Sequence, residues 1–457
     1  MALRKILIAN RGEIACRVME SCRGMDIGTV AVFSEADADA KHVEMADDAV
    51  AIGPAPAAQS YLNADAILRA AAETGAEAIH PGYGFLAEDP AFADAVETVG
   101  LVWIGPRPQT IADMGDKHQA RRIAEAAGVP ILPGSGPINA EDTATLARTA
   151  EAIGYPLLVK AAAGGGGIGM GLVEDPAELA AQVGKTAALA ARNFANGTVY
   201  LERYITNARH VEVQVFGYGN GAGVHFFNRD CSVQRRFQKI IEEAPAPHIP
   251  PKVRDGMYDA AMNLVRSQRY RGAGTVEFIV DRDAETFYFL EMNTRIQVEH
   301  PVTEMITGID LVRSQIELAG GTLEPAAQSE IEMHGAAIEC RIYAERPEKN
   351  FLPSPGTLSR FQVPDAMDDL RIDTGLRQGD TITPHYDPLI AKVIVRGPDR
   401  GAAIDLMVPV LEHVDIAGPS TNLDFLDRVL RDPVFRLSLP TTQYVSAGSY
   451  LTIPSNR

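Results

Sequence analysis

Strands and helices alternate over about the first hundred residues, and this order constrains the fold more than any other feature of the sequence. Four short apolar runs predict buried strands, at residues 5–10, 29–33, 77–80 and 101–104. One helix is predicted from Arg11 to Arg23; another starts at Asp89, an N-cap residue before Pro90, and ends at Gly100. Such alternation is typical of a parallel, Rossmann-like sheet. No Gly-x-Gly-x-x-Gly motif follows the first strand, so we do not expect a dinucleotide there.

The size and charge of the chain narrow the class of protein. At 457 residues it is longer than one ordinary core, which predicts two or three subdomains. The formal net charge of −18 argues against a nucleic-acid partner, because phosphate backbones need a basic surface. Neither a membrane-spanning run nor a signal or transit peptide is recognisable, and the four cysteines lack Cys-x-x-Cys spacing. We therefore expect a cytoplasmic protein without membrane or nucleic-acid partners.

The pattern changes along the rest of the chain. A helix that carries Lys117 near its start leads to a smaller unit around a strand at residues 156–160. From Tyr200 onward strands dominate, with predicted strands at residues 209–216, 275–280, 287–293, 339–343 and 392–395, and a helix at 400–411. The sequence thus predicts an α/β fold that becomes α+β in its C-terminal part.

Two acidic residues of one predicted hairpin suggest a metal site. A turn near residues 283–284 places Glu277 opposite Glu291, within one register step. On the second strand, alternation with a period of two points Glu291, Asn293 and Arg295 to the same side. Carboxylate and amide oxygens suit Mg²⁺ or Mn²⁺. The alternative is a salt-bridged surface hairpin, which the apolar residues around these acids argue against.

The same alternation is expected to continue through Arg295, Gln297 and Glu299. The arginine fork can bind a small planar oxyanion with two hydrogen bonds, and a neighbouring carboxylate can remove a proton from it. Taken alone, an arginine and a glutamate at this spacing usually form an ion pair. The adjacent metal acids favour a reaction centre within residues 291–299.

Four consecutive glycines follow the predicted strand that ends at Lys160; they are Gly164, Gly165, Gly166 and Gly167. Backbone N–H groups of such a run can close over phosphate oxygens, and a nearby lysine adds positive charge. No Gly-Lys-Ser/Thr follows, so the run is not a P-loop. A plain flexible loop and a lid over a nucleotide are both open at this point.

A basic cluster, CSVQRRFQK, lies in this otherwise acidic chain. Lys239 could hold an anionic substrate. Equally, the cluster could be a solvated face in which Arg235 and Arg236 balance Glu242 and Glu243.

Two further polar residues favour a structural interpretation. His210 lies on a predicted strand, where a lone histidine is more often structural than a ligand. Cys231 has no evident histidine or asparagine partner, which indicates an inert packed thiol.

Several motifs of the chain occur together in one protein family. They are IANRGEIA, HPGYGFLAE, MGDK, RDCSVQRR, EEAPAP, GAGTVEF, EMNTRIQVEHPVTEMITG, ECRIYAE and FLPSPG. In this order they resemble the biotin carboxylases, and the resemblance extends over nearly the whole chain. It implies an ATP-grasp fold with an N-terminal Rossmann-like domain (1–116), linker helices and a mobile lid (117–203), a large subdomain (204–333), a biotin carboxylase C-terminal domain (334–447) and a tail (448–457).

The resemblance also implies ligands for individual residues. ATP would be bound by Lys117, Lys160, Gly164 to Gly167, Glu202, Arg203, Tyr204, Ile205, His210, Gln234, Glu277 and Glu291. Magnesium or manganese would be held by Glu277, Glu291 and Asn293. Bicarbonate would be held by Lys239, Arg295, Gln297, the Val298 backbone and Glu299, and biotin by Arg341.

In the reaction that the resemblance implies, Glu299 would deprotonate bicarbonate, which would then attack the γ-phosphate of ATP and give carboxyphosphate. This intermediate would release CO₂ beside biotin, and the phosphate left behind would take the proton of the ureido nitrogen. Arg341 would stabilise the resulting enolate. Lys239, Arg295, Glu299 and Arg341 would thus be catalytic, and the positive charges would stabilise phosphoryl transfer.

Three positions depart from the family pattern. Ile168 stands where a basic residue is usual, Gly171 replaces a common arginine, and Phe237 stands where many relatives carry histidine or asparagine. ATP affinity is therefore left open. None of the 13 methionines is followed by lysine, so the Met-Lys-Met biotinylation motif is absent. The chain would act on biotin carried by another protein, or be the front part of a longer carboxylase.

The resemblance implies two partners, a biotin carboxyl carrier protein or domain and a carboxyltransferase subunit, in a homodimer or larger complex. The final acceptor would be an acyl-CoA of the acetyl or propionyl type. One alternative is another ATP-grasp ligase that activates a different carboxylate, which Arg341 and residues 295–299 argue against. A second is a catalytically silent ATP-binding scaffold, against which the retained metal and base residues weigh.

Overall fold

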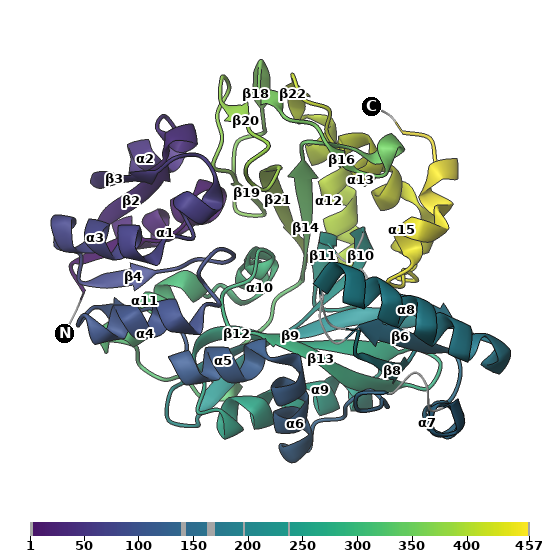
Figure 1. Ribbon diagram of the computed structural model, residues 1–457. Coiled ribbons are helices and arrows are strands. Elements are labelled where there is room, and N and C mark those ends of the chain that lie inside the picture. The colour runs from purple at the N-terminus through teal and green to yellow at the C-terminus, as the bar shows by residue number, and fades with distance from the viewer. Residues whose placement is uncertain (1–2, 139–142, 162–169, 195–196, 236–237, 456–457) are drawn as a thin grey trace.

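The computed structural model describes residues 3–138, 143–161, 170–194, 197–235 and 238–455. Three sheets organise them: a five-stranded parallel sheet, a three-stranded antiparallel sheet and an eight-stranded antiparallel sheet. In Figure 1 the parallel sheet lies at the left, the three-stranded sheet at the right, and the strands of the large sheet meet in the middle. The site described below depends on how the large sheet is flanked by the other two.

The N-terminal sheet is parallel, with the order β3-β2-β1-β4-β5, which confirms the predicted Rossmann-like arrangement. Its strands are β1 (Lys5–Ile8), β2 (Gly28–Ser34), β3 (Asp48–Gly53), β4 (Ala78–His80) and β5 (Val102–Trp103). Its helices are α1 (Gly12–Arg23), α2 (Lys41–Met45), α3 (Ala64–Thr74), α4 (Pro90–Thr98) and α5 (Pro108–Gly115). As predicted, Asp89 caps α4 by accepting the N–H groups of Ala91 and Phe92. The sequence pattern misses β3, because this edge strand is largely exposed.

A small unit follows, in which helices cover a three-stranded sheet with the order β7-β6-β8. The strands are β6 (Leu157–Ala161), β7 (Met170–Val173) and β8 (Val199–Arg203), and the helices are α7 (Thr143–Ile153) and α8 (Leu179–Phe194). The preceding helix, α6 (Lys117–Ala126), packs Ala120 and Ala124 into a core of the large sheet instead. Leu157, Val159 and Leu201 pack against Leu146 of α7 and Val183 of α8 in a core of their own. This separate core makes the unit a distinct body above the large sheet.

The large sheet is antiparallel and has the order β13-β12-β9-β10-β11-β14-β21-β19. Its strands are β9 (Ala208–Tyr218), β10 (Gly223–Arg235), β11 (Gln238–Ala244), β12 (Arg271–Asp281), β13 (Thr286–Asn293), β14 (Ala336–Tyr343), β19 (Leu370–Asp373) and β21 (Leu389–Gly397). The chain crosses the expected boundary at 333/334 and then pairs β14 with β11. One continuous sheet therefore includes both expected domains.

The two faces of the large sheet differ in chemistry. One face is apolar and packs against α9 (Pro251–Ser267) and α12 (Arg400–Glu412). The other carries charged side chains of several strands and faces α10 (His300–Thr307), which lies at the centre of Figure 1. Because side chains alternate between faces along a strand, buried valines and buried acids follow one another on β9 and β12.

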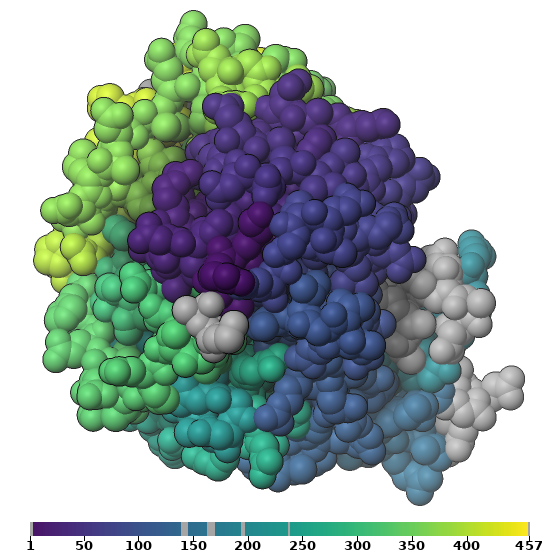
Figure 2. Space-filling view, turned by 90° about the vertical axis from the view of Figure 1, so that its left-hand side faces the viewer, coloured from purple at the N-terminus to yellow at the C-terminus, as the bar shows by residue number. Residues whose placement is uncertain are grey.

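The N-terminal sheet also contacts the C-terminal part of the chain. Lys41 Nζ donates to the Thr374 carbonyl at 2.9 Å, and the hydroxyls of Ser34 and Tyr386 lie 2.6 Å apart. Figure 2 shows the purple N-terminal elements against the green C-terminal ones. These contacts close one end of the space above the charged face.

Of the remaining helices and strands, the first named below packs beside α1 of the N-terminal part, and the others extend the C-terminal part. They are α11 (Leu311–Gly320), α13 (Leu423–Arg431), α14 (Pro433–Arg436), α15 (Tyr444–Ala447), β15 (Glu345–Arg346), β16 (Leu352–Pro353), β17 (Gly356–Thr357), β18 (Arg360–Gln362), β20 (Thr381–Ile382) and β22 (Asp415–Ala417). Among the described residues, no helix combines the length and the apolar character needed to cross a membrane. All four cysteines are buried free thiols.

A buried histidine of the N-terminal sheet predicts loss of stability in acid. His80 is fully buried, its Nδ1 accepts the Gly82 N–H at 3.0 Å, and burial lowers its pKa to about 4. In the unfolded chain its pKa is about 6.5, so the unfolded state binds more protons between these values. The stability from neutral His80 is present above pH 6.5 and is lost as the pH falls toward 4. At pH 5 we expect a loss of about 2 kcal/mol.

The His80→Asn variant tests this, because an asparagine oxygen can accept the same N–H group and does not titrate. Thermal unfolding should show a smaller drop in Tm between pH 7.5 and pH 5 for the variant than for the unmodified chain. An equal drop in the two proteins would contradict the role of His80.

Candidate functional site

The predicted hairpin of acids is present, with Glu277 buried and Glu291 half-buried. Glu277 on β12 lies directly opposite Glu291 on β13, which confirms the predicted register; a bulge follows between Glu277 and Phe278. Glu277 is only 3% exposed, so the surface-hairpin alternative is wrong. Glu277 also lies opposite Glu212 of β9, and Glu212 lies opposite Arg229 of β10. A charged row thus crosses four strands on one face.

The expected alternation beyond Asn293 is wrong. Strand β13 ends at Asn293, and residues 294–299 form an irregular loop that leads into α10. The loop nevertheless returns its polar side chains to the acids, because Gln297 Nε2 donates to Glu277 Oε1 at 3.0 Å. Beyond Asn293, the polar side chains thus reach Glu277 through hydrogen bonds of the loop, and not because they alternate along a strand.

Arg295 is held in a fixed orientation by three partners. Its Nε donates to Glu88 at 2.8 Å, Nη1 to Gln297 Oε1 at 2.8 Å, and Nη2 to Asn293 Oδ1 at 2.9 Å. Glu88 comes from the loop before α4, so the N-terminal sheet orients a side chain of the central site. A guanidinium fixed in this way is preorganised for a planar oxyanion.

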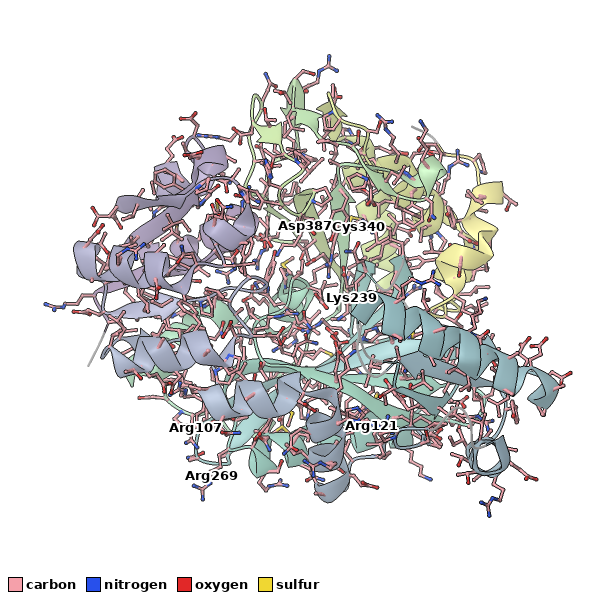
Figure 3. The ribbon with its side chains drawn as sticks, viewed as in Figure 1. Arg107, Arg121, Lys239, Arg269, Cys340 and Asp387 are labelled. Atoms are coloured by element: carbon pink, nitrogen blue, oxygen red, sulfur yellow. The ribbon has the colours of Figure 1, made fainter. Side chains whose placement is uncertain are left out.

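Lys239 lies among three carboxylates. Its ammonium contacts Glu277 Oε1 and Glu299 Oε1 at 2.7 Å each, and it also pairs with Glu212. Burial alone would lower the pKa of Lys239, but the three carboxylates hold that pKa well above its usual value. The lysine is therefore a fixed positive charge near the centre of the molecule, as Figure 3 shows.

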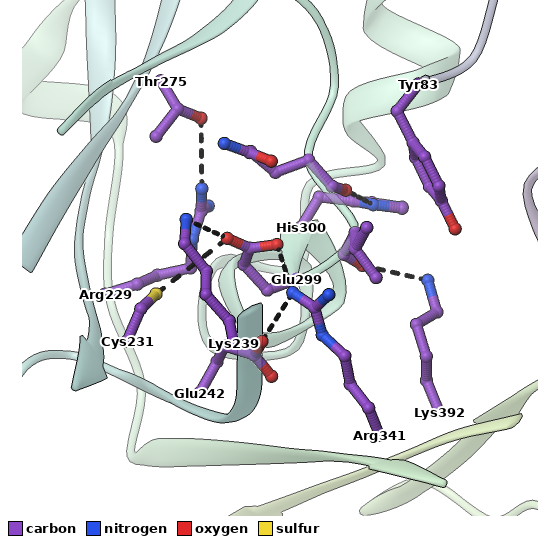
Figure 4. A network of polar contacts seen from close by, with 12 residues as sticks. Tyr83, Arg229, Cys231, Lys239, Glu242, Thr275, Glu299, His300, Arg341 and Lys392 are labelled. Carbon is purple, nitrogen blue, oxygen red and sulfur yellow. Dashed lines mark hydrogen bonds and ion pairs between the residues drawn. The ribbon is translucent and has the colours of Figure 1, made fainter. Parts of the chain in front are cut away.

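Glu299 stands between two cations. Its Oε1 contacts Lys239, and its Oε2 accepts from Arg341 Nη2 at 2.8 Å (Figure 4). Burial opposes ionisation, but Lys239 and Arg341 hold the pKa of Glu299 well below its usual value. The carboxylate is therefore ionised, and ionisation is the first requirement of a proton acceptor.

Arg341 is shared between two glutamates. Its Nη2 atom pairs with Glu299 and also with Glu242 of β11. Burial raises the pKa of Glu242 to about 7 in spite of this partner. Among the described residues, Arg235 does not balance Glu242 or Glu243, because it pairs with Glu345, and Glu243 pairs with Arg400. Arg236 lies outside the described residues.

The hairpin acids form a suitable donor set for a divalent cation. Glu277 has its pKa lowered: burial opposes this, but Lys239 and His210 outweigh it. Burial raises the pKa of Glu291, and the adjacent charge of Glu277 raises it further. A dication between these two carboxylates would relieve their repulsion. Asn293, whose side-chain oxygen accepts from Arg295, brings an amide group to the same place, and carboxylate and amide oxygens suit Mg²⁺ or Mn²⁺.

His210 has a structural partner in this site. Its Nε2 lies 2.7 Å from Glu277 Oε2, and it is buried on β9. Burial would lower its pKa, but Glu277 raises that pKa above the usual value. Cys231 is buried as well, and burial raises the pKa of its thiol well above normal, so it is no nucleophile at neutral pH.

On the side of the small unit, Lys160 and Arg121 both pair with Glu202. Lys160 comes from β6 and Glu202 from the neighbouring strand β8, where register places Glu202 opposite Leu158. Lys117 is the first residue of α6 and is one of the charges that act on Glu291. These residues border the same space from the opposite side.

One cavity of about 1150 Å³ joins the two sides. Every described residue among the predicted site residues lines it: Lys117, Lys160, Glu202, Arg203, Tyr204, Ile205, His210, Gln234, Lys239, Glu277, Glu291, Asn293, Arg295, Gln297, Val298, Glu299 and Arg341. Gly164 to Gly167, Ile168 and Phe237 lie outside the described residues. Gly171 lies in β7, where a Cβ would clash with Gln182 of α8.

Sequence reasoning missed three residues that support this site, namely Glu88, Arg229 and Glu242. Arg229 is completely buried and donates to Gln214 and Thr303 at 2.7 and 3.0 Å, besides pairing with Glu212. A signal existed only for Arg229, as an arginine within an otherwise buried strand. Glu88 lies 207 positions from its partner Arg295 in the chain, and no local pattern reveals such a pair.

Three family descriptions match the chain in order. They are "Biotin carboxylase, N-terminal domain" over residues 2–111, "Carbamoyl-phosphate synthase L chain, ATP binding domain" over 116–325, and "Biotin carboxylase C-terminal domain" over 339–447.

Curated relatives extend this similarity. A biotin carboxylase of Allochromatium vinosum is 50% identical over 434 residues, which cover 95% of this chain and 96% of the relative. The mitochondrial methylcrotonoyl-CoA carboxylase subunit alpha of Arabidopsis thaliana is 49% identical over 97% of this chain. The chain spans 60% of the length of that longer relative.

Solved structures agree in fold. The biotin carboxylase domain of a Hydrogenobacter thermophilus 2-oxoglutarate carboxylase, in complex with MgADP, ADP and bicarbonate, superposes with a TM-score of 0.90 at 43% identity and covers 98% of this chain and 99% of that one. A Campylobacter jejuni biotin carboxylase in complex with an ATP analogue gives a TM-score of 0.90 at 40% identity, covering 97% and 99%.

Proposed function

This chain belongs to the biotin carboxylase family of ATP-grasp ligases, and we propose that it uses ATP and bicarbonate to carboxylate biotin that a separate protein or domain carries. The observation that supports this most is the arrangement around Glu299. An ionised carboxylate lies between Lys239 and Arg341, next to the fixed fork of Arg295 and the paired acids of the hairpin. An anion site, a proton acceptor and a metal site thus adjoin one another.

For ATP, we propose that Lys117 and Lys160 contact the phosphates, and that the glycines of 164–167 close over them. Residues 202–205 would form the hinge on the adenine side, and His210 and Gln234 would lie near the nucleotide. When bound, Mg²⁺ or Mn²⁺ would neutralise phosphate charge, held by Glu277, Glu291 and Asn293. Lys160 now pairs with Glu202 and would turn toward the more strongly charged phosphates.

For bicarbonate, we propose that Arg295, Lys239, Gln297 and the Val298 backbone hold the anion while Glu299 accepts its proton. Arg295 and Lys239 stabilise the second negative charge that bicarbonate gains when it loses its proton. This lowers the pKa of bound bicarbonate, so that a carboxylate with a low pKa can act as the base. The resulting carbonate would attack the γ-phosphate to give carboxyphosphate and ADP. Positioning of the two anions side by side is the main task of the cations.

For biotin, we propose that carboxyphosphate decomposes to CO₂ and phosphate, and that this phosphate removes the ureido proton. Arg341 would then stabilise the enolate and direct it to CO₂. Arg341 lies on the same cavity as Arg295, so the two steps can share one enclosed space.

The wider assembly is also proposed. A biotin carboxyl carrier and a carboxyltransferase would act with this chain, in a dimer or larger complex, and an acyl-CoA would be the final acceptor. The carboxylase names of the relatives support this. Free buried thiols suit a reducing compartment such as the cytoplasm. We keep the boundaries 1–116, 117–203, 204–333 and 334–447 as proposed domains, with a tail at 448–457.

The test is a measurement of ATP cleavage by purified protein with Mg²⁺. We expect ADP formation that depends on bicarbonate and that free biotin stimulates, since both substrates meet in one cavity. ATP turnover indifferent to bicarbonate would refute the proposal and favour a ligase for another carboxylate. Binding of ATP without any turnover would favour a non-catalytic scaffold.

A further inference from the structure

Lys392 is a completely buried cation that the proposed chemistry does not use. It lies on β21, and its side chain is 0% exposed. Its ammonium group has three partners: the Val298 carbonyl at 3.0 Å, Glu13 at 3.0 Å and Asp373 at 3.4 Å. Lysines are almost never fully buried unless they are paired, because removal of an ammonium from water is costly.

The three partners come from three separate parts of the fold. Glu13 belongs to α1, which directly follows β1 of the N-terminal sheet, and Asp373 to β19 beside β21. Val298 belongs to the loop between β13 and α10, immediately before Glu299. Lys392 thus connects the N-terminal helix and the C-terminal strands to the loop that carries the proposed base.

The contact with Val298 is specific in its geometry. The carbonyl of Val298 and the N–H of Glu299 share one planar peptide group, so a fixed carbonyl fixes the direction in which the chain enters Glu299. In register, Lys392 lies directly opposite Arg341 of β14. Figure 4 shows the two cations beside each other, with Arg341 on the Glu299 carboxylate and Lys392 on the preceding carbonyl. Arg341 of β14 thus holds the side chain of Glu299, and Lys392 of the adjacent strand β21 holds the peptide group that precedes it.

We propose that Lys392 is a positioning residue, which fixes the Val298–Glu299 peptide and thereby aims the Glu299 carboxylate at bicarbonate. It touches no substrate and acts through the loop. This inference rests on the proposed function. A misplacement of about 1 Å at a reacting group can cost about 100-fold in rate, so such a brace has a measurable effect.

The Lys392→Met variant tests this, because methionine keeps an unbranched side chain that is one atom shorter and removes the ammonium. Arg371→Met is the matched control. Arg371 is a partly buried cation, 23% exposed, that pairs with Asp373 and Glu304, but it makes no contact with the loop at 294–299 among the contacts of the described residues. Each variant removes one cation, Lys392 from β21 or Arg371 from the neighbouring strand β19, and both cations pair with Asp373.

In bicarbonate-dependent ATP cleavage, Lys392→Met should lower kcat/KM for bicarbonate about 10- to 100-fold and leave the KM for MgATP unchanged. Arg371→Met should keep both values. Equal losses in the two variants, or no loss in Lys392→Met, would overturn the positioning role. A rise in the KM for MgATP equal to the loss toward bicarbonate would also overturn it, because that would indicate general loosening.

A second measurement does not depend on activity. Hydrogen exchange followed by mass spectrometry should show faster exchange in peptides that cover 294–300 for Lys392→Met, and unchanged exchange there for Arg371→Met. Unchanged exchange in both variants would refute the positioning role of Lys392, whether or not the protein is active. Absence of bicarbonate-dependent activity in the unmodified protein would refute only the proposed function. If Lys392→Met does not fold, Lys392→Met/Glu13→Gln removes the unpaired acid, and comparison with Glu13→Gln alone decides the question by the same criteria.

Discussion

Replacement of Glu299 by glutamine is expected to lower bicarbonate-dependent ATP cleavage by at least about 100-fold, the usual contribution of a positioned general base. The amide keeps the size of the side chain and can still accept a hydrogen bond from Lys239 or Arg341, but it cannot accept a proton from bicarbonate. Binding of MgATP, measured by calorimetry, should remain. Glu299 is linked to a residue proposed to contact ATP only indirectly, through Lys239, which pairs with both Glu299 and Glu277 among the described residues.

The matched control is Glu339→Gln. Glu339 is a buried glutamate on β14, two residues from Arg341, and burial raises its pKa well above the usual value. Neither of its carboxylate oxygens has a hydrogen-bond partner among the described residues, so the amide should change the rate little. If Glu299→Gln retained the unmodified rate, the assignment of Glu299 as the base would be wrong. If Glu339→Gln lost as much activity, the effect would belong to the buried charge network as a whole.

Replacement of Arg229 by methionine is expected to lower the free energy of unfolding by about 3–5 kcal/mol, since it leaves a buried carboxylate without its main partner. Arg229 is completely buried and joins Glu212, Gln214, Thr275 and Thr303, which come from three elements. Without it, Glu212 has Lys239 as its one remaining ion-pair partner among the described residues, and two other carboxylates share this lysine. Urea denaturation followed by circular dichroism measures the loss.

Two comparisons separate this effect from a general loss of charge. Arg229→Met/Glu212→Gln should recover part of the stability, because the second change removes the unpaired charge. Arg313→Met removes an arginine from an exposed helical pair with Glu317 and should cost less than about 1 kcal/mol. A loss in Arg229→Met no larger than in Arg313→Met would contradict the account of the buried row.

The hairpin register was predictable because it depends on local information. A short turn and a period of two are enough to place Glu277 opposite Glu291, and the structure has this pairing. The same reasoning failed three residues after Glu291, since nothing in the composition of residues 294–299 distinguishes a strand from a loop held by side-chain hydrogen bonds. The convergence of these side chains was still predicted, although for a wrong reason.

The ion pairs that orient the site were not predictable from local patterns. Glu88 and Arg295 meet only because the N-terminal sheet packs beside the large one, and Lys392 meets Val298 only because β21 joins the same sheet as β9 and β12. Periodicity describes one element at a time and contains no information on which elements become neighbours. The bicarbonate and biotin roles came from the family resemblance alone.

The continuous sheet has a consequence for how this chain could be divided. Strand β11 pairs with β14 on the far side of the boundary proposed at 333/334. A fragment that ended there would leave the backbone N–H and C=O groups of β11 unpaired along an open edge, with Ile240 and Ile241, buried in the whole chain, uncovered. Exposed edges of this kind promote association between chains. The two C-terminal domains are thus distinct in sequence family but are not separable units of folding, and genetic fusions or insertions are better placed in surface loops than at this boundary.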